Sequence, residues 1–228
     1  MRKLLIALVV VAILVVAADR ISLYVAQRKI ANRVTAAYSL ATSPAVTITG
    51  FPFLTQVIVG RYQQVVVTMG SLDAGGVQLD GLTARFAGVR APLRQLLGTG
   101  PSAVTADHAT ATGVLPFETV QRRLPPGITI SADGERVRLT GNLGFQGVQV
   151  PISAGVSLHV TSEAIEMSPR DLKVAGSPTV PSLVGSRLVI ALPVHDLPMQ
   201  LKVRAVRVTT HGFAVTASAR GVEFENGG

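Results

Sequence analysis

The side chains that could do chemistry are four histidines and a few carboxylates, and they do not form a known catalytic or metal-binding motif. His108, His159 and His211 stand in strand or turn contexts, and His195 precedes Asp196 in a proline-flanked loop. Zinc sites and acid–base pairs need ligands or partners at defined spacing. We therefore predict surface histidines, while a metal site assembled from distant residues stays open.

Other chemical motifs are missing as well. The chain has no nucleophile elbow, phosphate loop or zinc-protease motif. It has no cysteine, which excludes disulfides and thiolate chemistry. A glycine pattern at residues 98–103 fits a dinucleotide-binding motif only formally, because an expected short helix precedes it. Glu163 and Glu166 are expected to be solvated charges. We predict a protein that is not an enzyme, with no catalytic residue, metal or cofactor.

The charge balance favours an anionic partner. The chain has 21 basic and 13 acidic residues, a net charge of +8, and 17 of the basic residues are arginine. Arginine binds phosphate groups through planar two-point contacts. This suits an anionic membrane surface or a lipid headgroup, although the arginines could also simply solvate the surface. Nucleic acid is not expected, because no aromatic stacking platform or known DNA-binding module is present.

The N-terminus has the pattern of an export signal. Arg2 and Lys3 precede an uninterrupted apolar run of fifteen residues, 4–18. This run is longer than a typical signal core and shorter than the roughly 20 residues that span a bilayer. Residues 1–18 are therefore either a signal peptide cleaved after Ala18 or a retained membrane anchor. In the second case, the positive-inside rule puts Arg2 and Lys3 in the cytoplasm and the body outside.

Residues 19–41 have the periodicity of an amphipathic helix. Its apolar side would pack on the domain, or its basic side would lie along anionic headgroups. The apolar positions are Leu23, Ala26, Ile30, Val34, Ala37 and Ala41, and the polar ones include Arg20, Arg28, Lys29 and Arg33.

Residues 42–226 are predicted to form a single strand-rich domain. Apolar residues alternate with polar ones, as at Val156, Leu158 and Val160, and Asp133-Gly134 and His211-Gly212 indicate tight turns between antiparallel strands. Short stretches that begin with proline predict small helices. The expected fold class is α+β, a long curved antiparallel sheet with short helices on one side.

Some strands are apolar on both faces, for example at residues 65–67 and 188–192. Both faces of such a strand must be covered. Other parts of the protein could cover them, and so could lipid tails.

Residues 50–62 read Gly-Phe-Pro-Phe-Leu-Thr-Gln-Val-Ile-Val-Gly-Arg-Tyr and are followed by Val65-Val66-Val67. This segment resembles a signature of the LmeA-type phospholipid-binding proteins of actinobacterial cell envelopes. The order of the parts also agrees, so the resemblance covers nearly the whole chain. It implies a fold similar to the tubular lipid-binding (TULIP-like) group, binding of phospholipid or phosphoinositide, and a supporting role in glycolipid assembly, such as that of lipomannan. It implies no catalytic residues.

Two sets of candidate binding residues follow, together with one alternative function. The signature helix carries an apolar cluster that lines either a tail groove or the protein core, and nearby arginines are candidates for contact with a headgroup or the membrane surface. The alternative is a membrane-tethered structural or assembly protein of the envelope that carries no lipid and contacts other envelope proteins. The tail candidates are Phe51, Phe53, Leu54, Val57 and Ile58, and the headgroup candidates are Arg61, Arg90 and Arg94.

Overall fold

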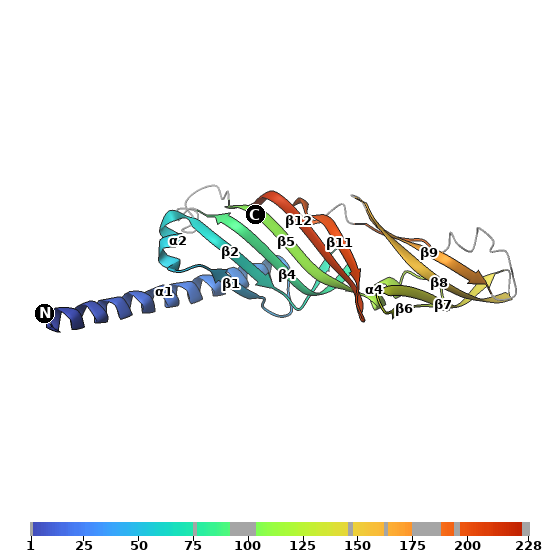
Figure 1. The fold of residues 1–228 in the computed structure, drawn as a ribbon, viewed down its shortest axis with the longest axis horizontal. Helices are drawn as coiled ribbons and strands as arrows, with labels where there is room; N and C mark the ends of the chain where they lie inside the picture. Colours follow the sequence, from blue (N-terminus) through green and yellow to red (C-terminus); the bar gives the residue numbers. More distant parts are fainter. Residues whose placement is uncertain are drawn as a thin grey trace. The chain divides into compact units, whose positions relative to one another are not determined.

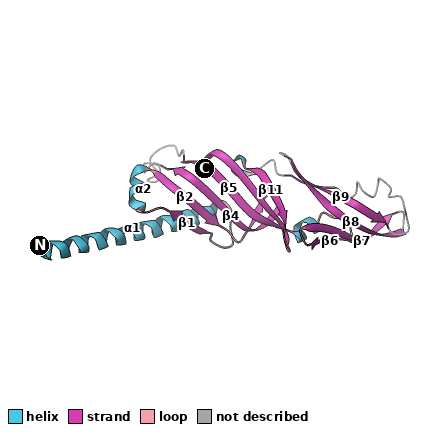
Figure 2. Ribbon diagram, viewed as in Figure 1, coloured by secondary structure: helices cyan, strands magenta, loops and turns pink. Residues whose placement is uncertain are grey.

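The computed structural model describes residues 2–74, 77–91, 104–145, 148–161, 164–174, 188–193 and 197–224. Strands dominate these residues (Figure 2). The helices are α1 (Arg2–Ala37), α2 (Phe53–Val59), α4 (Phe117–Gln121) and the 3-10 helix η1 (Pro198–Gln200). The strands are β1 (Ala45–Thr49), β2 (Arg61–Thr68), β3 (Ser71–Ala74), β4 (Val77–Arg90), β5 (Val104–Pro116), β6 (Ile128–Asp133), β7 (Arg136–Phe145), β8 (Val148–Val160), β9 (Ala164–Val174), β10 (Ile190–Pro193), β11 (Lys202–Val208) and β12 (Gly212–Phe224).

The strands form two sheets. One has seven strands in the order β1-β2-β4-β5-β12-β11, with β3 also paired to β4, and the other has five in the order β10-β9-β8-β7-β6. The strand pairs whose register is described are antiparallel. The predicted α+β class with an antiparallel sheet is confirmed.

The chain divides into two compact units. The first comprises Met1–Gly70, Thr83–Thr110 and Ala219–Gly228, and the second comprises Ser71–Leu82 and Ala111–Ser218. Strands β4, β5 and β12 contribute residues to both units, since each is a long strand of 13 or 14 residues.

In the first unit, α1 lies beside β1 and α2 (Figure 1). Its second half turns Leu23, Ala26, Ile30 and Val34 into partly buried positions, and this is the stripe that the helical spacing predicts. The expected helix extended to residue 41, but α1 ends at Ala37. Ala37, at this end, and Ala41, beyond it, are exposed.

An apolar row crosses the sheet of this unit. Ile48 pairs with Val65, and Val65 pairs with Phe86, so the three side chains share one face. The Phe86 ring also meets the ring of Phe224 edge to face, with centroids 5.1 Å apart. Ile48 and Phe86 are buried, whereas Val65 is only half-buried.

In the second unit, side chains fill the interior between the two sheets. The core includes Leu115, Val120, Leu139, Met167 and Phe213, and strand β11 of the first sheet packs near β8 of the second. The Phe117 ring stands edge-on to the fully buried Phe213 at a centroid distance of 5.2 Å. This unit therefore has a continuous core of its own.

The predicted tight turns are confirmed. Strands β6 and β7 pair up to Asp133 and Arg136, and the intervening Gly134 has a φ of 65°. Strands β11 and β12 pair up to Val208 and Phe213, around His211-Gly212. Gly212 lies tightly against β5, because a Cβ there would approach the carbonyl oxygen of Leu115 to 2.1 Å.

We predict that Gly212→Ala destabilises the fold by about 2–3 kcal/mol, since a methyl group would displace backbone atoms that cannot move independently. The matched control is Gly134→Ala, whose Cβ would meet nothing within 4 Å and whose cost is only the positive φ, about 1–2 kcal/mol. Urea unfolding of the full chain in detergent micelles measures both. Equal costs for the two variants would contradict the close approach at Gly212.

Candidate functional site

The first half of α1 is exposed on all sides. Its large apolar side chains between residues 4 and 16 are 44% to 74% exposed. The helix is long and apolar enough to cross a membrane. A helix that is apolar all round needs apolar surroundings.

Asp19 is the one buried residue of α1, a helix of which every residue is described. Its side chain is 1% exposed, and its Oδ1 accepts a hydrogen bond from the backbone N–H of Leu54 at 2.8 Å. Leu54 lies in the first turn of α2, where backbone N–H groups have no partner within the helix. Pro52, the N-cap residue of α2, provides no side-chain cap. Asp19 therefore caps α2 from a distance of 35 residues in sequence.

Arg20 reinforces the same junction. Its guanidinium lies over the ring of Phe51, 4.9 Å from the centroid. Such cation–π contacts contribute about 0.5–1 kcal/mol at exposed sites. Two consecutive residues of α1 thus contact residues 51 and 54, on either side of the turn into α2.

Gln56 completes the turn from β1 into α2. Its Oε1 accepts the N–H of Gln63 at 3.1 Å, directly beyond the last β1–β2 pair, Thr49 with Gln64. A Cβ at Gly50 would approach the Gln56 amide nitrogen to 2.6 Å, and Gly50 has a φ of 107°. Only glycine fits both requirements. Two buried polar atoms at this junction, Asp19 Oδ2 and Gln56 Nε2, have no hydrogen-bond partner within the described part of the chain.

The five tail candidates do not share one environment. Phe53 is 3% exposed and packs toward Tyr62, with ring centroids 6.1 Å apart. Burial raises the pKa of the Tyr62 hydroxyl above its ordinary value of 10.0, so this ring stays neutral. Leu54 and Val57 are half-buried. Phe51 and Ile58 point outward, at 60% and 76% exposure.

The headgroup candidates also differ from one another. Arg61 and Arg90 are directly opposite on β2 and β4. Arg90 is paired, since its Nη2 lies 2.7 Å from Oδ1 of Asp107, whereas Arg61 is exposed. Gly88 makes room for this pair, because a Cβ there would collide with the Asp107 carboxylate. Arg94 lies outside the described residues.

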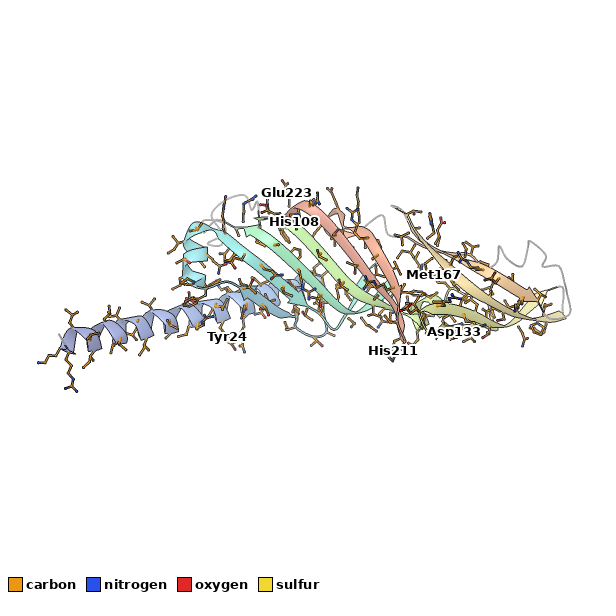
Figure 3. The ribbon with its side chains drawn as sticks, in the orientation of Figure 1. Tyr24, His108, Asp133, Met167, His211 and Glu223 are labelled. Carbon is orange, nitrogen blue, oxygen red and sulfur yellow. The ribbon has the colours of Figure 1, made fainter. Side chains whose placement is uncertain are left out.

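A shallow pocket opens between α1 and the start of β1. It has a volume of about 180 Å³ and is lined by Tyr24, Gln27, Arg28, Ala31, Pro44 and Val46. The Arg28 guanidinium lies 4.8 Å from the centroid of the Tyr24 ring, which Figure 3 labels. Sites that enclose a whole drug-sized ligand are usually about 300–1,000 Å³. The pocket is therefore smaller than a site that encloses a whole ligand, and the exposed Arg28 lies at its rim.

The sequence pattern pointed to no role for Asp19 or Gln56 and predicted no pocket, although Arg28 was expected on the basic side of the helix. One sequence signal marks Asp19, which is the only acidic residue among the first 72. Among the described residues, no group of three histidine or carboxylate side chains could hold a metal ion.

We predict that Asp19→Ala frees the start of α2, because the N–H of Leu54 loses its acceptor. The expected loss of stability is about 1–2 kcal/mol, with faster hydrogen exchange in α2. Asp19→Asn keeps a side-chain oxygen and should retain most of the protection. Hydrogen–deuterium exchange of the full chain in micelles measures this. Unchanged exchange at Leu54 in Asp19→Ala would show that the cap has no structural role.

Comparison with known proteins identifies the family of this chain. A family model described as LmeA-like phospholipid-binding matches residues 17–218. That range begins two residues before Asp19 and includes α2, the pocket residues and the strands β1 to β11, and it ends within β12. Searches of curated proteins and of solved structures gave no match. Because the match covers most of the chain, the protein belongs to the LmeA-like phospholipid-binding family.

Proposed function

We propose that this protein is exported and tethered by α1 to the outer face of the plasma membrane, where it binds phospholipid. The observation that supports the tether best is the continuity of α1, which runs unbroken from Arg2 to Ala37. Its first half is exposed and apolar, and its second half packs on the first unit. One helix thus joins a membrane-spanning segment to a lipid-binding domain.

Retention of residues 1–18 is favoured over cleavage. A cut after Ala18 would make Asp19 the N-terminal residue and place an ammonium group beside its buried carboxylate. The helical turn that positions Asp19 against Leu54 would also lose its preceding residues. If residues 1–18 were cleaved instead, the domain would be released from the membrane.

The binding site that we propose is the pocket beside α1 together with half-buried valines of the first unit. Val46 and Val65 are half-buried there, and Val46 also lines the pocket. Arg28 at the rim provides an exposed cation for a phosphate group. Arg61 is a second candidate, whereas Arg90 already has a carboxylate partner.

The role of the bound lipid is inferred from the family to which the chain belongs. We propose that the bound lipid supports glycolipid assembly or lipid transfer in the envelope, without catalysis and without a cofactor. Phosphoinositide is a candidate ligand because its extra phosphates suit an arginine-rich protein. A cargo-free assembly protein is the second candidate, favoured by the second unit, whose described core is filled by side chains.

The test is to fill the pocket. Ala31→Phe places a large ring among the pocket residues, while Ala36→Phe makes the same change at an exposed position of the same helix. We expect Ala31→Phe to reduce severalfold the phospholipid that co-purifies with the full chain, as measured by native mass spectrometry from micelles. Ala36→Phe should carry as much lipid as the unaltered protein.

Two results would count against this proposal. Unaltered protein without bound lipid, even after incubation with anionic phospholipid, would favour the cargo-free alternative. Equal lipid content in the two phenylalanine variants would remove the pocket from the binding site while leaving lipid binding itself intact.

A further inference from the structure

The apolar run of α1 is too short to cross a bilayer alone. Residues 4–18 are fifteen residues, and at roughly 1.5 Å per residue they extend about 22 Å. The hydrocarbon core of a bilayer is about 30 Å thick, which requires about 20 residues. If α1 spans the membrane, as the proposed tether requires, then part of the helix beyond Asp19 must also lie within the bilayer.

The outward face of α1 allows this. Ile21, Tyr24 and Val25 follow Asp19 and are all exposed. Residues 4–25 extend about 33 Å, which matches the hydrocarbon core. Arg28 then follows and stacks on Tyr24. Tyrosine and arginine are typical of the membrane–water interface, so the boundary falls near this pair.

This boundary puts Asp19 inside the lipid. Asp19 precedes Val25 by six residues, about 9 Å along the helix axis. A carboxylate at that depth needs a protein partner. The N–H of Leu54 provides one, and the carboxylate is 1% exposed. The element that covers Asp19 is α2, so α2 must lie at a similar depth.

The surface of α2 fits an apolar environment. Phe51, just before α2, and Ile58 and Val59, in its last turn, are 60%, 76% and 68% exposed, which is unusual for a water-facing helix of seven residues. Residues 51–61 contain no acidic side chain. The Arg20 guanidinium lies over the Phe51 ring, and Arg61 is exposed just beyond α2, where its long side chain can reach phosphate groups from below.

We propose that α2 is embedded in the membrane leaflet on the domain side, with Phe51, Ile58 and Val59 among the acyl chains, Arg20 covering the Phe51 ring and Arg61 reaching the lipid phosphates. The occupant of this exposed surface is the bilayer itself. The same boundary near Tyr24 and Arg28 places the pocket beside them at headgroup level.

The absence of native cysteine makes a direct test possible, since one introduced thiol is the only one in the chain. The full chain is prepared as single variants Leu8→Cys, Ile58→Cys, Val59→Cys and Thr129→Cys, all at exposed positions. Each is labelled with an environment-sensitive fluorophore and reconstituted in vesicles of phosphatidylglycerol and phosphatidylcholine. Brominated acyl chains quench labels within the bilayer, and iodide quenches labels in water.

We expect the labels at positions 58 and 59 to behave like the label at position 8, with strong quenching by brominated chains and severalfold weaker quenching by iodide than at position 129. Labels at 58 and 59 that behave like the label at 129, while the label at 8 is lipid-quenched, would overturn the embedding of α2 and leave the tether intact. A label at 8 that iodide reaches freely would overturn the tether and this inference together. Lipid co-purification, measured separately, depends on neither result.

Discussion

A carboxylate that directly follows a long apolar run must find a hydrogen-bond donor, and the junction between α1 and α2 depends on how Asp19 does so. The donor is the first turn of α2, through the N–H of Leu54. That contact fixes α2 against α1, places Phe51 under Arg20 and sets the chain direction into β2. One such cap contributes only about 1–2 kcal/mol to stability. Breaking this hydrogen bond, however, would leave both the Asp19 carboxylate and the N–H of Leu54 without a partner.

Both units bury some aliphatic side chains and leave others partly exposed. In the second unit Val120 and Val137 are almost inaccessible to solvent, whereas Val156 and Val206 are partly buried. In the first unit Val67 and Val89 are buried, whereas Val46 is only half covered by protein. Small, half-covered aliphatic surfaces suit an acyl chain, because a ligand can complete the burial that the protein leaves unfinished. Such surfaces occur in both units, and we propose lipid contact in the first because Val46 there also lines the pocket.

Charge is distributed unevenly along the chain. The first 72 residues contain seven basic residues and one acidic residue, a net charge of +6 out of the total of +8. The remaining residues are nearly balanced. Attraction between exposed charges fades over about 8 Å at physiological salt, so a charged residue acts on a membrane only when it lies close to the membrane surface. The excess lies in the part of the chain that contains α1 and α2.

Local sequence was sufficient to predict the fold class and the hairpin turns at Gly134 and Gly212, because turns depend on a few adjacent residues. It was not sufficient to separate Phe53, which is buried, from Phe51, which is exposed two residues earlier. Nor could it pair Arg90 with Asp107, or Asp19 with Leu54. The partners in these two pairs are 17 and 35 residues apart in sequence, and only the folded chain brings them together. Periodicity specifies which way a side chain faces on its own helix or strand. It does not specify which distant group the side chain meets there.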